Sequence, residues 1–215
     1  MRAPDICFTH QGLALRLWQG WLDQEARRVV RGHLEAAIRW EQPLVRVYGR
    51  LHRVPRLVAW VGDPGCSYRY SGHRHLPLPW TPELDELRDR LERSLGFRFN
   101  SLLLNRYRNG LDRMGWHADD EPELECHHPI ASLSLGASRD LRFRPRHAPA
   151  SADHSREGVA HEATTAAAPF TLNLADGDLL LMDPPTQQHW LHALPTRRRI
   201  IGARFNLTFR RLRHS

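Results

Sequence analysis

Two short stretches carry the residue types best suited to chemistry, "WHADDEPE" at 116–123 and "TQQHWLHALP" at 186–195. The first sets His117 beside four acidic residues in a chain whose formal net charge is +7. Such a cluster is costly unless water solvates it or it holds something positive, so it is either a wet acidic loop or a metal site. In extended structure residues i and i+2 point to the same side, which would bring His117 and Asp119 together. We interpret this pair as part of a candidate metal site.

The second stretch offers two candidates for a third ligand, His189 and His192. Two histidines and one carboxylate form the facial triad of non-haem Fe(II) oxygenases, which leaves coordination positions open. A closed zinc site would more often use paired cysteines, and Cys7, Cys66 and Cys126 are widely spaced. "ECHH" at 125–128 could also bind zinc, but it is a single cluster without a partner. The pattern therefore favours iron.

Two further segments could hold an anion beside that metal. If "ARFNLTFR" at 203–210 is a strand, its polar residues share one face and its apolar residues the other. The polar set is Arg204, Asn206, Thr208 and Arg210. This face either lies in water or uses its two arginines to clamp a dicarboxylate. In "LLLNRYR" at 102–108, Asn105 and Tyr107 share a face and could donate hydrogen bonds to a carboxylate, although ordinary strand patterning explains them equally well.

These residues need a scaffold of helices and strands. We predict a helix from an N-cap at Asp23 to Trp40, with an apolar face made by Ala26, Val29, Val30, His33, Ala37 and Trp40. A second helix runs from Thr81 to Gly96 with a leucine stripe. From Phe97 the pattern is that of short strands, with turns at 137–140 and 175–178. Strands that follow helices predict a β-sandwich or jelly roll with helices on one side.

Three segments stand apart from this scaffold. "PLVRVYGRLHRVPR" at 43–56 alternates apolar and basic residues around Gly49 and predicts a basic β-hairpin. The turn-rich, aromatic segment at 61–80 predicts an exposed loop or short strands. Residues 146–168 lack periodicity, and we expect a mobile insertion there.

Composition excludes several classes of protein. The chain has no lysine, so its 31 basic residues are all arginine, and Schiff-base, pyridoxal phosphate and P-loop chemistry are excluded. The positive charge fits either an anionic partner such as nucleic acid or a basic, solvated surface. An odd number of scattered cysteines fits a reducing compartment, and we read no signal peptide and no membrane span.

Taken together, the motifs resemble the AlkB family of Fe(II)/2-oxoglutarate dioxygenases. The similarity runs through "VRVYGRLHRVPR", "GDPGCSYRYSG", "NSLLLNRYRNGLDRMGWHADDEPEL", "PIASLSLGASRDLRFR", "GDLLLMDPPTQQHWLHALP" and "RFNLTFR", in order, over about 44–212. It is strongest toward the branch that repairs alkylated duplex DNA. The resemblance implies a mostly β (α+β) fold, a double-stranded β-helix (jelly roll) with N-terminal helices packed on one sheet.

The same resemblance implies one dioxygenase domain over 1–215. Its parts would be an N-terminal helical extension at 1–43, a nucleotide-recognition hairpin and lid at 44–80, a jelly-roll core at 97–212 and the insertion at 146–168.

The resemblance also assigns roles residue by residue. His117, Asp119 and His192 resemble the Fe(II) ligands, whereas His189 stands at a position that the family does not use. The 2-oxoglutarate contacts would be Asn105, Tyr107, Arg204, Asn206 and Arg210. The base and DNA contacts would be Tyr68, Tyr70, Asp120, Glu121, Val47, Tyr48, Gly49, Arg46, Arg50 and Arg53. Tyr70 stands where the family often has phenylalanine.

The implied activity is oxidative demethylation of bases such as 1-methyladenine and 3-methylcytosine in DNA. It would use Fe(II), 2-oxoglutarate and O₂ and release formaldehyde, succinate and CO₂. The base must leave the stack to be reached, and we expect Tyr68 and His117 to sandwich it. Two alternatives remain, a dioxygenase with RNA, protein or lipid as substrate and a nucleic-acid-binding module without catalysis. We expect a monomer in the cytoplasm, or in the nucleus of a eukaryote.

Overall fold

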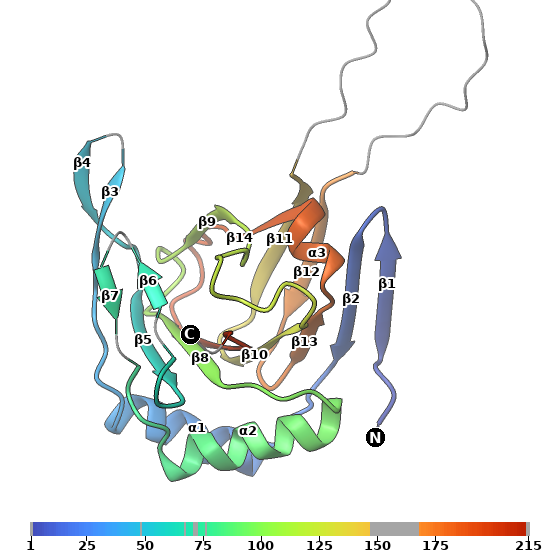
Figure 1. Ribbon diagram of the computed structural model, residues 1–215, viewed down its shortest axis with the longest axis horizontal. Helices are drawn as coiled ribbons and strands as arrows, with labels where there is room; N and C mark the ends of the chain where they lie inside the picture. The colour runs from blue at the N-terminus through green and yellow to red at the C-terminus, as the bar shows by residue number, and fades with distance from the viewer. Residues whose placement is uncertain are drawn as a thin grey trace, which may run out of the picture.

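The computed structural model describes residues 2–47, 49–66, 68–70, 73–75, 77–146 and 168–213 (Figure 1). For 46–47, 68–70 and 73–75 it describes the backbone alone. Its centre is two antiparallel sheets that face each other, as the jelly-roll prediction requires. The larger sheet has the strand order β1 (Ile6–His10), β2 (Leu13–Trp18), β13 (Leu179–Met182), β10 (Ile130–Gly136), β15 (Arg204–Arg210), β8 (Ser101–Tyr107) and β5 (Leu57–Gly62). The smaller has the order β12 (Phe170–Leu174), β11 (Arg139–Pro145), β14 (Trp190–Leu194) and β9 (Met114–His117).

The larger sheet is covered on both faces. One face packs against the helices α1 (Gln24–Ala36) and α2 (Pro82–Leu95), which lie side by side beneath it in Figure 1. The other face meets the smaller sheet in a second core that includes Leu180 and Phe143. Because both faces are buried, successive residues of β10 and β13 are all apolar or small. The mostly β fold with helices packed on one sheet is confirmed.

The caps of the two long helices follow the sequence signals. The Asp23 side chain accepts a hydrogen bond from the N–H of Ala26, and Thr81 accepts one from Leu84. Gly96 ends α2 in the left-handed conformation, with φ of 76°, where a side chain would be strained. The predicted face of the first helix is wrong at Val29, which is 46% exposed. Val30, which was predicted in this face, is buried, and so is Leu34, which was not; the helix ends at Ala36 and not at Trp40.

The helical extension expected over 1–43 is wrong for its first half. β1 and β2 occupy this segment, and β2 pairs with β13 inside the larger sheet. The alternation in "LALRLW" buries Leu13, Leu15 and Leu17 against the smaller sheet. A turn at Gln11 and Gly12, both with positive φ, joins the two strands. The boundary of the jelly-roll core at residue 97 is also too narrow, since β5 and β2 come from before it.

Two small hairpins lie beside the sheets. The predicted basic hairpin is β3 (Leu44–Val47) and β4 (Arg50–Arg53), with Gly49 at its tip at φ of 78°. It projects away from the sheets in Figure 1. The turn-rich segment contains a second hairpin, β6 (Tyr68–Tyr70) and β7 (His73–His75). Most of the insertion expected at 146–168 lies outside the described residues, as does Tyr48.

A short helix, α3 (Pro185–His189), leads directly into β14. Neither α3 nor β14 was predicted, because "TQQHWLHALP" has too short an apolar pattern to distinguish helix from strand. No helix in the described part of the chain is long and apolar enough to cross a membrane.

Candidate metal centre and its two cavities

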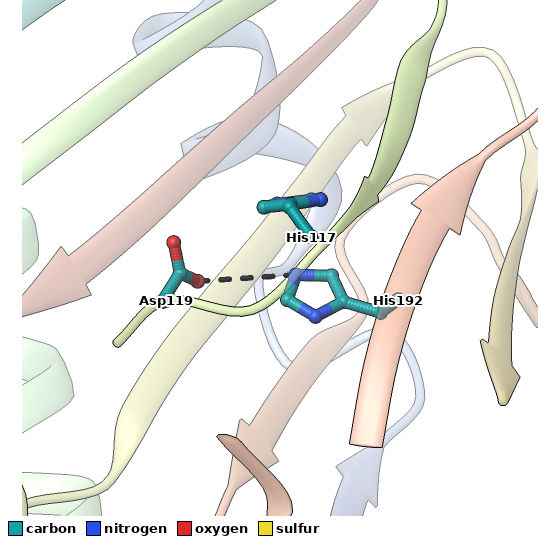
Figure 2. A group of neighbouring side chains, drawn as sticks. All are labelled: His117, Asp119 and His192. Atoms are coloured by element: carbon teal, nitrogen blue, oxygen red, sulfur yellow. Dashed lines mark ion pairs between the residues drawn. The ribbon is translucent and has the colours of Figure 1, made fainter. Parts of the chain in front are cut away.

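Three side chains converge between the sheets, one from β9, one from β14 and one from the segment that follows β9. His117 ends β9, and the register of β9 with β14 places it directly opposite His192. Asp119 follows two residues after β9 ends. The ligand-type atoms of these three residues all lie within 4.8 Å of one another, and Figure 2 shows the carboxylate and both rings pointing to a common centre. Within the described residues no other group of this kind forms.

Hydrogen bonds and burial prepare the two rings to bind a metal. Nδ1 of His117 lies 2.9 Å from the Gly115 carbonyl oxygen, which leaves Nε2 free to coordinate. His192 is 6% exposed, and its Nε2 lies 3.8 Å from Asp119 Oδ2. Burial lowers the pKa of His192 to about 3; His117 acts in the same direction and Asp119 opposes both. The ring is therefore neutral at physiological pH, as metal binding requires.

The Asp119 carboxylate is held in its charged form. Burial alone would raise its pKa, but Arg210, followed by His192 and His117, keeps the pKa below its usual value. Arg210 Nη1 lies 3.5 Å from Asp119 Oδ1. The backbone N–H of Asp119 donates to Gln187 Oε1 at 2.9 Å. One carboxylate and two imidazoles form a facial set that suits Fe(II) and leaves positions open for other ligands.

An inner cavity opens from this triad into the space between the sheets. It is lined by both ring ligands, by Asp119 and by the predicted residues Asn105, Tyr107 and Asn206. The pairing of β8 with β15 sets Asn206 opposite Asn105, and Arg204 opposite Tyr107. The prediction that these side chains share one face is confirmed. The alternative that this face lies in water is wrong, because Asn105 is 6% exposed and Arg204 is 1% exposed.

Arg204 does not itself line this cavity, but it precedes Asn206 by two residues in β15 and its guanidinium contacts the Asn206 side chain, which does. Its guanidinium donates to Ser134 Oγ at 2.9 Å and to Asn206 Oδ1 at 3.3 Å, and its carbon Cζ lies 5.6 Å from the centre of the Tyr107 ring. Burial lowers the pKa of Arg204 to about 10, although Tyr107 favours the charge. In the described part of the chain no carboxylate forms an ion pair with it, and its Nε has no hydrogen-bond partner. A buried guanidinium that has no carboxylate partner among the described residues is suited to bind an anionic ligand.

A second, outer cavity of about 190 Å³ shares His117 and Asp119 with the inner one. Its lining includes His117, Asp119, Arg210 and Glu121, together with Trp60 from β5. Arg210 therefore lines this outer cavity, whereas Asn105, Tyr107 and Asn206 line the inner one. His117 and Asp119 belong to both walls, so a metal held by them faces both cavities.

The remaining predicted contacts have mixed positions. Glu121 lines the outer cavity, but Asp120 does not; its carboxylate lies 2.6 Å from Arg146. Its expected contact with the base or with DNA stays a prediction. Gly49, Arg50 and Arg53 are exposed on the β3–β4 hairpin. The side chains of Arg46, Val47, Tyr68 and Tyr70, like all of Tyr48, lie outside the description.

The alternative ligand His189 is excluded by position. It is exposed at the end of α3, and its ring packs against Gly12 in the β1–β2 turn. The fit is so close that a Cβ added to Gly12 would lie 2.5 Å from the ring. Sequence reasoning also missed Arg56, which is buried and donates from Nε to Asn105 Oδ1 at 2.7 Å. Arg56 ends the quoted motif "VRVYGRLHRVPR", so its place in an ordered motif was the available signal.

Comparisons with known proteins agree with this geometry. The sequence profile described as the 2OG-Fe(II) oxygenase superfamily matches residues 14–210. The chain belongs to this superfamily. Its metal and co-substrate, Fe(II) and 2-oxoglutarate, are the pair that the motifs predicted, and the triad and the inner cavity fit them.

The chain is also similar to proteins of the AlkB family, which confirms that resemblance. It is 45% identical to mouse "DNA oxidative demethylase ALKBH2" over 168 aligned residues. The alignment covers 78% of this chain and 66% of that protein. The human protein of the same name is 42% identical, with 78% and 60% covered. Human "Alpha-ketoglutarate-dependent dioxygenase alkB homolog 3" is 35% identical over 196 residues, with 90% and 64% covered. The chain thus spans less than two thirds of the length of these curated relatives.

A solved structure confirms the fold. The structure of OsALKBH1 superposes with a TM-score of 0.58 at 18% identity and covers 95% of this chain and 100% of the other. At this identity the likeness concerns the jelly-roll fold alone.

Proposed function

We propose that this chain oxidatively demethylates N-alkylated bases in DNA, such as 1-methyladenine and 3-methylcytosine, as a direct repair reaction. Iron with 2-oxoglutarate and O₂ supplies the oxidation of the N-methyl group, which leaves as formaldehyde while succinate and CO₂ are formed. The observation that carries the proposal is that His117 and Asp119 line two cavities at once. We assign the dicarboxylate to the inner cavity, because hydrogen-bonding side chains line it, and the base to the outer cavity of about 190 Å³. The relatives named as DNA oxidative demethylases support the choice of substrate.

The chain's residues would bind and orient the co-substrate in the inner cavity. Arg204 supplies a buried positive charge, and Tyr107 and the two asparagines supply hydrogen-bonding groups along the path to the triad. Arg210 adds charge on the far side of Asp119. Burial strengthens these interactions, because little water competes for the charged groups.

The outer cavity supports a methylated base as substrate. Bases methylated at these nitrogens carry a positive charge, and Glu121 supplies a carboxylate to the cavity wall, where Arg210 lies 3.5 Å from it. The same methyl group blocks pairing, which lowers the cost of moving the base out of the duplex. The exposed Arg50 and Arg53 on the projecting hairpin favour contact with phosphates. We expect a monomer to act in the compartment that holds the DNA, the cytoplasm of a bacterium or the nucleus of a eukaryote.

The test is formaldehyde release from oligonucleotides that carry 1-methyladenine or 3-methylcytosine, with Fe(II) and 2-oxoglutarate present. We expect turnover with wild type and none with His117→Ala. Methylated RNA and methylated peptides are the comparison substrates. Faster turnover of RNA or peptide than of DNA would overturn the substrate, and equal activity in His117→Ala would overturn the metal assignment. A lack of turnover on all substrates, despite tight Fe(II) and 2-oxoglutarate binding, would also contradict the proposed reaction.

A further inference from the structure

The short helix α3 is fixed to the N-terminal strands rather than to the smaller sheet that it precedes. The Thr186 side chain is fully buried and exchanges two hydrogen bonds with the backbone of Ala14 in β2. Their lengths are 3.0 Å from the Ala14 N–H to Oγ1 and 2.9 Å from Oγ1 to the Ala14 carbonyl. Immediately after α3, Trp190 donates from Nε1 to the carbonyl of Gln11 at 3.0 Å. The position of α3 is therefore set by β2 and by the β1–β2 turn.

Gln187 reaches from this fixed helix to the metal centre. The residue is 7% exposed. Its Oε1 accepts the backbone N–H of Asp119 at 2.9 Å, and its Nε2 lies 3.4 Å from the sulfur of Met182. Met182 is in β13 and lines the inner cavity. The two contacts orient the amide, because the oxygen meets a donor and the nitrogen meets an acceptor.

Asp119 needs such support more than the other two ligands. His117 and His192 are held by the pairing of β9 with β14, but β9 ends at His117. Among the described residues, the N–H of Asp119 has no backbone acceptor. Its bond to Gln187 is thus the contact that fixes the peptide from which the carboxylate projects. Rotation of that peptide would move the carboxylate away from His192, whose Nε2 is 3.8 Å from Oδ2.

We propose that Gln187 is a positioning residue that holds Asp119 in the geometry for metal binding and links this ligand to the N-terminal strands through α3. Partners behind a metal ligand typically change metal affinity by about 10- to 100-fold when they are removed. The proposal rests on the iron site of the superfamily. It does not depend on the DNA substrate, so its failure would leave the proposed demethylation standing, and the reverse also holds.

The experiment compares three variants of the full chain. Gln187→Met keeps the length of the side chain and removes the acceptor. Gln187→Glu keeps an oxygen acceptor at the same place. Gln188→Met is the matched control, because Gln188 is an exposed residue of the same helix. The measurements are the affinity for Co(II), titrated by its visible absorption, the shape of that spectrum at saturation and the melting temperature of the metal-free protein.

We expect Gln187→Met to weaken Co(II) binding at least about 10-fold and to change the saturated spectrum. Gln187→Glu should recover most of this affinity, and Gln188→Met should bind like wild type. Wild-type Co(II) affinity and spectrum in Gln187→Met would overturn the proposal. Equal losses in the Met and Glu variants would overturn it too, because the Glu variant keeps the acceptor oxygen and the shape of the side chain. If Gln187→Met does not fold, the Glu variant decides: weak Co(II) binding with a wild-type melting temperature would contradict the role.

Discussion

Replacing Arg204 by Met should stabilise the protein without its ligands and abolish its response to 2-oxoglutarate. Arg204 is 1% exposed and is bonded to two neutral acceptors, Ser134 Oγ and Asn206 Oδ1. Burial lowers its pKa from 12.5 to about 10. The charged form is therefore disfavoured in the folded protein, and this penalty applies at neutral pH, where the side chain is charged in both folded and unfolded states.

The size of the effect follows from that pKa. A change from 12.5 to about 10 corresponds to about 3 kcal/mol of free energy at neutral pH. Methionine removes this penalty but leaves the two acceptors without their donor, which costs about 1–2 kcal/mol. The net gain in the free energy of unfolding is about 1–2 kcal/mol, which agrees with replacements of buried charges by apolar residues. For a chain of this size it raises the melting temperature by roughly 4 °C.

The ligand response should change in the opposite direction. With Mn(II) in place of iron, no turnover occurs, and 2-oxoglutarate at about 100 times its dissociation constant stabilises the wild type by about 2.7 kcal/mol. That is a rise of roughly 5–10 °C in melting temperature. The variant lacks the buried cation that contacts Asn206 in the wall of the inner cavity, so we expect a rise below about 2 °C. The assay is thermal unfolding of both proteins with and without Mn(II) and 2-oxoglutarate.

Arg139→Met is the control that separates charge from hydrogen bonding. Arg139 is also buried, and burial lowers its pKa too, but its guanidinium donates to the carbonyls of Asn109, Asp112 and Pro195. Losing three backbone contacts costs about 3 kcal/mol or more, so this variant should melt at least roughly 6 °C lower. If Arg204→Met is destabilised as much as Arg139→Met, or keeps the full response to 2-oxoglutarate, the reasoning is refuted.

Three further perturbations test other parts of the structure by thermal or denaturant unfolding. The pKa of His192 is about 3 in the folded protein and about 6.5 in the unfolded chain. As pH falls through this range, the free energy of unfolding of the metal-free protein should therefore decrease by a few kcal/mol. The decrease should be smaller in His192→Gln. Gly110→Ala should lower stability by more than about 2 kcal/mol, because its Cβ would meet the Arg197 carbonyl, whereas Gly32→Ala in the open face of α1 should raise it by about 0.5–1 kcal/mol. Thr186→Val leaves the Ala14 N–H without its acceptor and should cost about 1–3 kcal/mol.

The elements that could be predicted from the sequence are those with strong local signals. The caps at Asp23, Thr81 and Gly96 lie where expected, since each depends on one side chain or one backbone conformation, whereas the C-terminal end of the first helix was predicted at Trp40 and lies at Ala36. The two-residue alternation in "RFNLTFR" gave the correct face of β15 because both faces of that strand are buried in different surroundings. Spacing alone did not choose between His189 and His192; the family resemblance did, and the register of β14 with β9 agrees.

The N-terminal strands could not be predicted because their partner lies far along the chain. Leu13, Leu15 and Leu17 fit a strand, but pairing with β13 joins residues that are more than a hundred positions apart. The same separation conceals the support of Asp119, since Gln187 lies 68 residues away from it in sequence. Neither segment has a local signal that indicates its distant partner. Strand pairing thus positions two of the three metal ligands, and a side-chain hydrogen bond positions the third. Because neither contact is local in sequence, the motif around His117 and Asp119 was by itself weak evidence for a metal site.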